Sequence, residues 1–193
     1  MRRIFGLAVA LCLVTGAANG SETPSGAEQL LMPLPDGFKV DYTLDEQRMR
    51  MAEFVPKAES VHAWSQMATR QVFLGRGGAD PDFVQQQVAA GWKAACPGAV
   101  AQRLEALPLN GYKATLWSFA CPLNPATGKP ETTWIKVISG ADSLYAAHYA
   151  FRDKAAPERS RTALDYLARV TVCDMRTVEH PCPAGVADAL AKP

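Results

Sequence analysis

The stretch NGYKATLWSFACPLNPATGKPETTWIKVISGADSLYAAHYAFR, residues 110–152, decides the fold because it predicts three successive strands. It opens with Asn110-Gly111 between two alternating runs, and both residues tolerate the positive φ of a type I′ turn. Residues 99–109 are then the first arm of a hairpin closed by this turn. Short loops separate the three runs, so antiparallel neighbours are the simplest topology.

The three runs are apolar on both faces. In the first, Ala114, Leu116, Ser118 and Ala120 share one face, and Thr115, Trp117, Phe119 and Cys121 share the other. In the third, Tyr145, Ala147, Tyr149 and Phe151 alternate with Leu144, Ala146, His148 and Ala150. Strands of this kind are typical of a sheet that is covered on both sides.

The residues before this stretch predict three more strands and a helix. Residues 38–45, 48–55 and 67–74 read as strands, and Ser60 is expected to cap a short helix through Trp64. Asp80-Pro81 is a helix start, with an N-cap acceptor followed by proline at the first helical position. The face of this helix that packs on the sheet is expected to carry Val84, Val88, Trp92 and Ala95, widened by Phe83.

A second main helix is expected after the third strand of the central stretch. It opens within residues 153–157, places Ala163, Leu167 and Val170 on one face and ends near Cys173. The predicted fold class is therefore α+β, with an antiparallel sheet covered by two main helices.

The first residues look like a targeting segment. Arg2 and Arg3 precede the apolar run 4–14, and Ala18-Asn19-Gly20 offers small residues for cleavage. We expect a signal peptide over 1–20, a flexible lead over 21–29, a single α+β domain over 30–183 and a loose C-terminal tail over 184–193. The predicted location is periplasmic or secreted, with no membrane association after cleavage.

The charge of the mature chain gives no reason to expect a nucleic-acid partner. Removing Arg2 and Arg3 lowers Lys+Arg from 20 to 18 against 19 Asp+Glu, so the net charge becomes 18 − 19 = −1. Such a balance attracts neither nucleic acid nor anionic lipid.

Cleavage would also remove Cys12 and leave an even set of cysteines: Cys96, Cys121, Cys173 and Cys182. In an exported chain such a set predicts two disulfides, with three possible connectivities. A two-residue loop at Asn110-Gly111 places Val100 opposite Cys121, and Pro97-Gly98 then turns Cys96 toward Cys121. The predicted pairs are Cys96–Cys121 and Cys173–Cys182.

The order of elements, with an early Pro-Asp-Gly-Phe turn and a closing helix, resembles the PsbP/Mog1/DcrB-like α/β/α sandwich. More narrowly, CPLNPATGKPETTW (121–134), GADSLYAAHYAFR (140–152) and CDMRTVEHPCP (173–183) resemble a family of uncharacterised exported bacterial proteins. This narrower resemblance covers residues 61–183. The broad group implies a binding or accessory protein, and neither resemblance carries over a catalytic residue.

The loop PLNPATGKPE, residues 122–131, is a candidate binding loop through Asn124, Lys129 and Glu131. It is not a phosphate-binding Walker loop, because Pro130 follows Lys129 and position 123 is Leu. The alternative interpretation is a stiff turn between two strands that has no binding role.

No complete catalytic motif is present in the sequence. A nucleophile elbow and a C-x-x-C pair are both absent. His180 between Cys173 and Cys182 suggests a metal site only if the cysteines are free thiolates, and a disulfide is the better explanation. His148 is an acid–base candidate if Glu131 or Asp142 approaches it, although a structural role is the commoner one for such a histidine.

Three functions are compatible with the sequence. The first is an exported, soluble, non-catalytic module that binds a protein partner in the cell envelope or a small ligand, with no cofactor or metal. The second is a hydrolase or transferase with a site around His148, Glu131 and Asp142. The third is an inhibitor or immunity-type protein that uses the 122–131 loop. Trp64, Trp92, Trp117 and Trp134 are interpreted as core residues, with a ligand groove as the alternative.

Overall fold

The structure is a computed structural model in which residues 27–105 and 110–186 are described. In chain order its elements are β1 (Glu28–Leu31), β2 (Phe38–Glu46), β3 (Met49–Pro56), β4 (Gln66–Leu74), α1 (Pro81–Ala95), β5 (Val100–Leu104), β6 (Lys113–Asn124), β7 (Lys129–Ser139), β8 (Ser143–Phe151), α2 (Pro157–Ala168) and β9 (Thr171–Asp174). The expected signal peptide, most of the expected lead and residues 187–193 lie outside the described residues.

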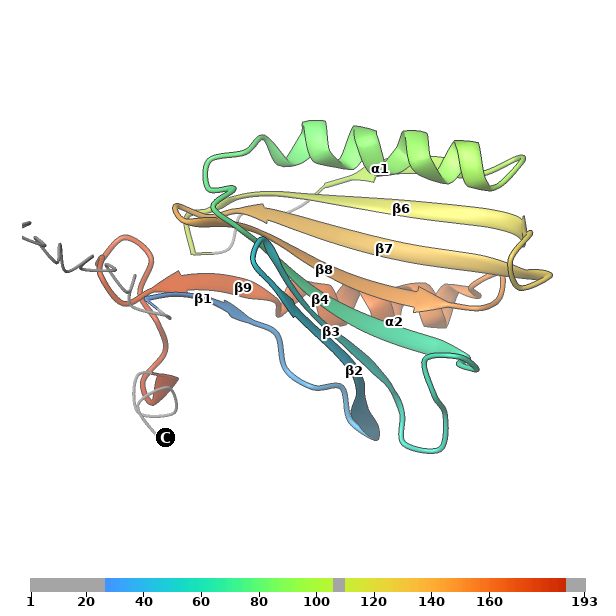
Figure 1. Ribbon diagram of the computed structural model, residues 1–193, viewed down its shortest axis with the longest axis horizontal. Coiled ribbons are helices and arrows are strands. Elements are labelled where there is room, and N and C mark those ends of the chain that lie inside the picture. The colour runs from blue at the N-terminus through green and yellow to red at the C-terminus, as the bar shows by residue number, and fades with distance from the viewer. Residues whose placement is uncertain (1–26, 106–109, 187–193) are drawn as a thin grey trace, which may run out of the picture.

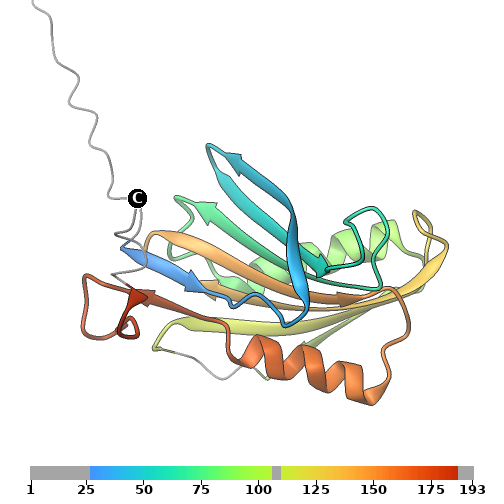
Figure 2. The same ribbon diagram turned by 90° about the horizontal axis from the view of Figure 1, so that it is seen from below.

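A seven-stranded antiparallel sheet in the order β2-β3-β4-β8-β7-β6-β5 forms the centre of the molecule. Helix α1 lies on one face and α2 on the other, as Figure 1 and the view from below in Figure 2 show. A two-stranded sheet of β1 and β9 is added at one end. The predicted α+β class, with two helices that cover an antiparallel sheet, is confirmed.

The alternation predicted for the central strands separates two cores. On the α2 side, Tyr145, Tyr149 and Phe151 from β8 pack with Tyr166 and Leu167 of α2. On the α1 side, the core contains Leu144 and Ala146 from β8 together with Phe119, Ile135 and Ala89. Strand β8 is buried along almost its whole length because both of its faces are covered.

The turn at Asn110-Gly111 has the predicted conformation, but the hairpin register is wrong by one residue. Asn110 and Gly111 have φ of 56° and 77°. Val100 nevertheless pairs with Ala120 rather than with Cys121. The pairing is therefore centred on residue 110 itself, whereas a two-residue loop would centre it between Asn110 and Gly111.

Both predicted disulfides are confirmed. Cys96 is the C-cap residue of α1 and bonds Cys121 of β6 across a Cα–Cα distance of 6.0 Å. The bond forms despite the shifted register because Cys96 belongs to the helix end above the sheet and not to the strand ladder. Cys173 and Cys182 bond across 4.8 Å and close the loop after β9.

Helix α1 begins where the sequence predicts, but its buried face differs. Asp80 caps the helix by accepting a hydrogen bond from the backbone N–H of Asp82. Phe83 is 60 % exposed, and Ala95 is exposed as well, whereas Gln85 is fully buried. Gln85 fits at this place because its Nε2 donates to the carbonyl oxygen of Ile135 at 2.7 Å.

Helix α2 ends earlier than predicted, at Ala168, and Cys173 lies in β9. The buried Lys136 of β7 holds this end, since its Nζ donates to the carbonyl oxygens of Leu167 (3.1 Å) and Val170 (2.7 Å). A side chain from the sheet thereby binds the carbonyl oxygens at and just after the helix C-terminus, where the Leu167 oxygen also accepts from the N–H of Val170 at 3.2 Å.

Two further local predictions are wrong. Residues 60–64 form no helix, because Ser60 and Ala63 pair in an isolated bridge that closes a turn. Glu28 and Gln29, expected in a flexible lead, belong to β1 and pair with Asp174 and Cys173. These two residues are held by pairing with β9, which lies far away in the chain. A prediction from local composition does not detect such a pairing.

Candidate functional site

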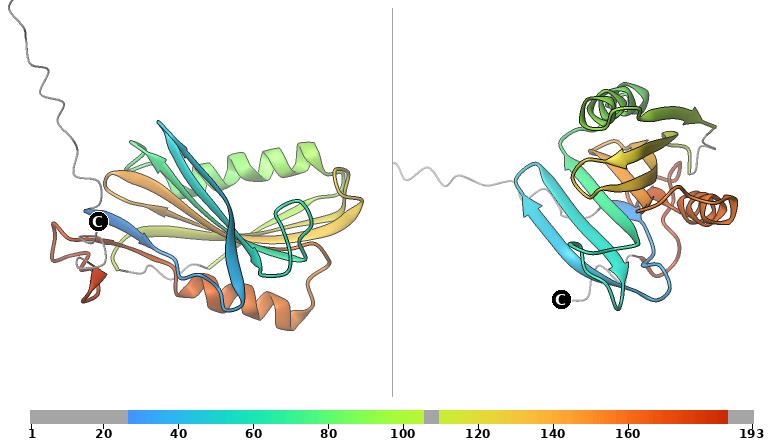
Figure 3. Two further views of the ribbon diagram at one scale, coloured as in Figure 1. Left: turned by 60° about the horizontal axis from the view of Figure 1, so that its bottom comes forward. Right: turned by 90° about the vertical axis from the view of Figure 1, so that its right-hand side faces the viewer.

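A groove opens on the α1 side of the sheet, beside the helix. Helix α1 packs on β5, β6 and β7, while Figure 3 shows β2 and β3 turning away from it. The sheet face of β3, β4 and β8 next to α1 is therefore not fully covered. We call this hollow, of about 330 Å³, the α1-side groove. It is lined by residues of α1, of the loop before β4 and of four strands: Glu53, Val61, Trp64, Met67, Thr69, Val88, Trp92, Glu131, Thr133, Ile135, His148 and Ala150.

Its floor consists of two rows of side chains that the strand register places on one face. The first row runs Glu53–Thr69–His148–Ile135 across β3, β4, β8 and β7. The second row runs Met67–Ala150–Thr133 across β4, β8 and β7. Because side chains alternate along each strand, residues opposite one another in the ladder point to the same face.

The walls of the groove come from α1 and from the loop before β4. Val88 and Trp92 project from the helix, and Val61 and Trp64 from the loop. The loop is fixed by its backbone, since the N–H of Val61 donates to the Asp41 carboxylate at 2.8 Å. The guanidinium of Arg152 lies over the Trp64 ring, 4.2 Å from its centroid.

The polar groups of the groove are poorly satisfied. Thr133 is 4 % exposed, and its Oγ1 has no hydrogen-bond partner among the described residues. Burial raises the pKa of Glu53 and lowers that of His148 to about 4, because each loses hydration of its charged form. His148 is consequently a neutral imidazole at physiological pH.

The structure brings together two of the three residues predicted for a catalytic site. His148 and Glu131 both line the groove, but they form no hydrogen bond with each other among the described contacts. Asp142 lies elsewhere, at the start of β8, where it forms an ion pair with Arg176 at 2.7 Å. The hydrolase or transferase hypothesis therefore loses Asp142, one of its three proposed catalytic residues.

The candidate binding loop 122–131 is shorter than predicted. Strand β6 continues to Asn124 and β7 starts at Lys129, with a register shift between Cys121 and Asn124. Asn124 donates to the Glu131 carboxylate at 2.8 Å and accepts from the N–H of Ala126. Asn124 is thus used within the turn, which leaves less of the loop for the recognition surface that the inhibitor hypothesis needs.

The four tryptophans divide between core and groove. Trp134 is 5 % exposed and packs edge-on against Phe151, as a core residue does. Trp117 is half-buried and donates to the Asp82 carboxylate at 3.4 Å. Trp64 and Trp92 instead line the groove. Their aromatic type was the only feature of the sequence that indicated a ligand groove.

His180 belongs to a structural contact and not to a metal site. Its ring stacks on Tyr112 with centroids 3.9 Å apart, and its Nδ1 lies 2.7 Å from the carbonyl oxygen of Asn110. The neighbouring cysteines are joined in the second disulfide. Within residues 27–105 and 110–186 no group of three or more metal-ligating side chains converges.

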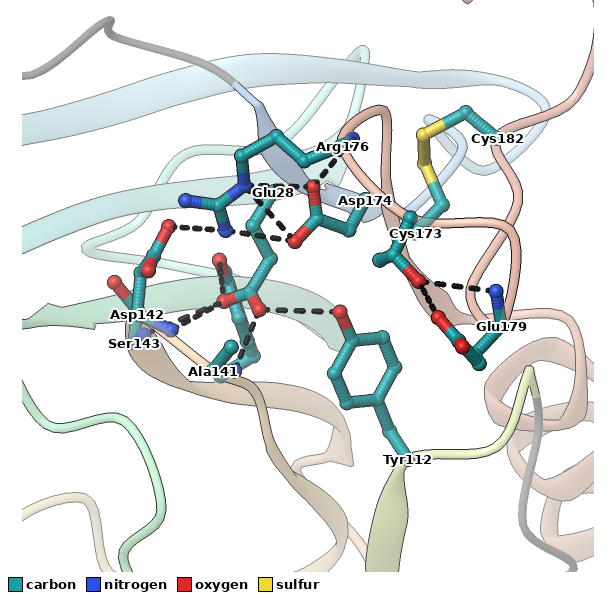
Figure 4. Close-up of polar contacts among 12 residues, drawn as sticks. Glu28, Tyr112, Ala141, Asp142, Ser143, Cys173, Asp174, Arg176, Glu179 and Cys182 are labelled. Carbon is teal, nitrogen blue, oxygen red and sulfur yellow. Dashed lines mark hydrogen bonds and ion pairs between the residues drawn. A yellow bond between two sulfur atoms is a disulfide. The ribbon is translucent and has the colours of Figure 1, made fainter.

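The most connected polar residue, Glu28, was missed because it falls in the segment predicted to be flexible. Its carboxylate accepts hydrogen bonds from the hydroxyls of Tyr112 (3.1 Å) and Tyr145 (2.8 Å). It also accepts from the N–H groups of Ala141, Asp142 and Ser143 in the β7–β8 turn (Figure 4). Sequence patterns carry no signal for these contacts, which join positions more than 80 residues apart.

An ion-pair cluster continues from this carboxylate toward the second disulfide. Arg176 bridges Asp142 and Asp174 and holds the pKa of the Asp174 carboxyl below its usual value (Figure 4). We call Glu28, its five donors and this bridge the Glu28 cluster. Burial and the nearby Glu28 raise the pKa of both Tyr112 and Tyr145, so these phenols remain donors.

A second hollow, of about 440 Å³, lies on the α2 side next to Tyr149 and Tyr166. Its two buried hydroxyls are paired, since that of Tyr149 donates to Gln66 at 3.1 Å and that of Tyr166 to the carbonyl oxygen of Pro33 at 2.6 Å. Its charged side chains, Asp36, Asp165 and Arg169, are exposed. The smaller α1-side groove is the stronger candidate site because a buried hydroxyl, of Thr133, and a half-buried carboxylate, of Glu53, line it without a described partner.

Two features bear on where the protein works. Two disulfides in one chain fit an extracellular location, outside a reducing cytoplasm. Among the described residues, no helix has the length and apolar character needed to cross a bilayer.

Comparison with known proteins gives a distant likeness only. The chain matches no protein-family model and no curated protein sequence. Among solved structures it is similar to the crystal structure of LpqN, involved in cell envelope biogenesis of Mycobacterium tuberculosis. The match has a TM-score of 0.39 and 16 % identity, over 78 % of this chain and 87 % of that one. No family is established by this likeness, and both resemblances drawn from the sequence remain predictions.

Proposed function

We propose that the protein is an exported module that binds a small ligand non-covalently in the α1-side groove and catalyses no reaction. The observation that carries this proposal is Thr133, which lines the groove and whose buried hydroxyl has no described hydrogen-bond partner. Buried polar groups are nearly always paired, and a bound ligand is one way to pair them. Export is supported by the expected leader over 1–20 and by the two disulfides.

The composition of the groove also favours binding over catalysis. Its walls are apolar and aromatic, with a few polar groups on the floor, as is usual for small-molecule sites. The cysteines are bonded to one another, so a thiolate nucleophile is excluded among the four. Thr69 and Thr133 supply the only side-chain hydroxyls among the lining residues, and no described hydrogen bond joins either of them to His148.

The test is titration with prodan, an uncharged dye whose emission shifts to the blue in apolar sites. Ala150→Phe fills the groove floor, and Ala120→Phe makes the same change at an exposed position on the opposite face of the sheet. We expect saturable binding of one dye per chain to the wild type and to Ala120→Phe, and none to Ala150→Phe. Circular dichroism checks that each variant folds.

Trp64→Ala is a second variant, on a surface loop, and serves if Ala150→Phe does not fold. It removes one wall of the groove, and we expect it to weaken dye binding by about tenfold, the loss of an aromatic contact. If the wild type shows no saturable binding, or the groove variants bind as the wild type does, the proposal is wrong.

A further inference from the structure

We infer that the ligand of the α1-side groove is an organic cation, with an ammonium or guanidinium group attached to an apolar body. The inference rests on the proposed function and deepens it by naming the chemical class of the ligand. Two independent features of the lining support the positive charge, namely its formal charges and its aromatic walls, and the rest of the lining supports the apolar body.

The charged side chains that line the groove are all acidic. Glu53 enters from β3 at one side of the floor and Glu131 from β7 at the other. No lysine or arginine is among the lining residues in the part of the chain that the structure describes. The low pKa of His148, about 4, keeps its imidazole uncharged, so it does not oppose a cation.

The carboxylate of Glu53 would be stabilised by a bound cation. This carboxylate is half-buried, and no described group donates a hydrogen bond to it. A carboxylate that has lost hydration without gaining a donor is destabilised in its charged form. An ammonium or guanidinium group would supply charge-assisted hydrogen bonds at this place.

The aromatic walls favour the same charge. The faces of Trp64 and Trp92 carry the negative part of the ring quadrupole, which attracts cations. The chain itself uses one of these rings in this way, since the Arg152 guanidinium lies 4.2 Å from the Trp64 centroid. Even with Arg152 counted, the formal charge around the groove stays at −1, from two carboxylates and one guanidinium.

The apolar body of the ligand follows from the rest of the lining. Met67, Val88 and Ile135 present methyl and methylene groups to the hollow. Thr133 also lines the hollow, and its hydroxyl, which has no described partner, is able to donate or to accept a hydrogen bond. A compact amine with an aromatic or branched body satisfies each of these groups.

The test compares three probes that share a phenyl body and differ in charge: 2-phenylethylammonium, 2-phenylethanol and 3-phenylpropionate. Their affinities are measured by displacement of prodan and by calorimetry. We expect the ammonium probe to bind about tenfold more tightly than the alcohol, with the carboxylate weakest. Raising the salt concentration should weaken binding of the ammonium probe and leave the alcohol unchanged.

Variants assign the effect to the groove. Glu53→Gln and Glu131→Gln should each lower the affinity of the ammonium probe by about fivefold while leaving the alcohol unaffected. Glu46→Gln, at an exposed position on β2, is the matched control and should change neither.

The outcomes separate the inference from the proposed function. If prodan binds in the groove but the alcohol or the carboxylate binds as tightly as the ammonium probe, the inference fails and the binding site stands. The inference also fails if the preference for the ammonium probe survives both glutamine substitutions. If Ala150→Phe does not affect prodan binding, the proposed function fails as well.

Discussion

Glu28 and Glu53 are both acidic side chains withdrawn from water, but their surroundings are opposite. Glu28 accepts hydrogen bonds from two phenols and three backbone N–H groups. Glu53 has no described donor, and the Thr133 hydroxyl on the same groove floor is unpaired as well. The Glu28 cluster is complete within the chain, whereas the groove has polar groups that only something outside the chain can pair.

This difference separates a structural site from a candidate binding site. A fully paired buried network stabilises the fold and gains nothing from a ligand. A buried group without a partner costs free energy in the empty protein, and that cost is recovered on binding. Substitutions in the two regions should therefore have opposite effects on stability.

Glu28→Gln should have the largest effect. The substitution keeps the size of the side chain but removes the charge and turns an amide donor toward groups that are themselves donors. We expect the free energy of unfolding to fall by about 3 kcal/mol, measured by urea denaturation with the disulfides intact. Glu46→Gln, exposed on β2, is the control. An unchanged midpoint for Glu28→Gln would mean that the cluster contributes little to the fold.

Lys136 is a buried cation whose hydrogen-bond partners are neutral carbonyl oxygens, so the stability of the protein should depend on pH through its titration. Burial lowers its pKa to about 8, so the unfolded chain binds more protons than the folded one between pH 8 and the ordinary lysine value. Stability should consequently rise with pH through this window. From pH 7.5 to 9.5 we expect a gain of roughly 2 kcal/mol in the wild type.

Lys136→Met should remove this gain, as measured by urea denaturation at the two pH values. Ile138→Met, on the same face of β7, is the control because it alters packing without altering charge. The tyrosines with raised pKa act in the opposite direction and only near the upper end of this range, because in the unfolded chain they keep the ordinary value of 10.0. Lys136→Met leaves their contribution unchanged. A slope that persists in Lys136→Met would assign it to another group.

Thr132 and Thr133 provide the smallest and sharpest comparison, because they are neighbours in β7. The Thr132 hydroxyl donates to the carbonyl oxygen of Asp153 at 3.0 Å and accepts from the N–H of Ala155, whereas that of Thr133 is unpaired. Thr132→Val should lower stability by about 1 kcal/mol, and Thr133→Val should leave it unchanged or raise it by up to about 1 kcal/mol. Thermal unfolding measures both effects. An equal loss of stability in the two variants would contradict the comparison.

Local patterns predicted the elements well where side-chain period and turn chemistry agree. Asp80-Pro81 starts α1, the period-two alternation of residues 143–151 gives β8, and Pro56 ends β3. Gln85 shows where such patterns fail. A polar residue was not assigned to the buried face, yet a carbonyl oxygen on β7 supplies its partner. Phe83, assigned to that face by its apolar type, is exposed.

By itself the sequence determined the fold class, because it depends on local periodicity, and the two disulfides, because each joins cysteines that lie near each other in the chain, 25 and 9 residues apart. It also supplied His148, Glu131 and the tryptophans as candidates without their arrangement. Only the tertiary structure decided that Glu53, Thr69, His148 and Ile135 form one row, since it depends on the pairing of β4 with β8, in which Thr69 lies opposite His148, 79 residues later in the chain. The same holds for Glu28, whose partners lie 84 to 117 residues away. Contacts over such separations are set by the packing of the whole sheet, and no local stretch contains them.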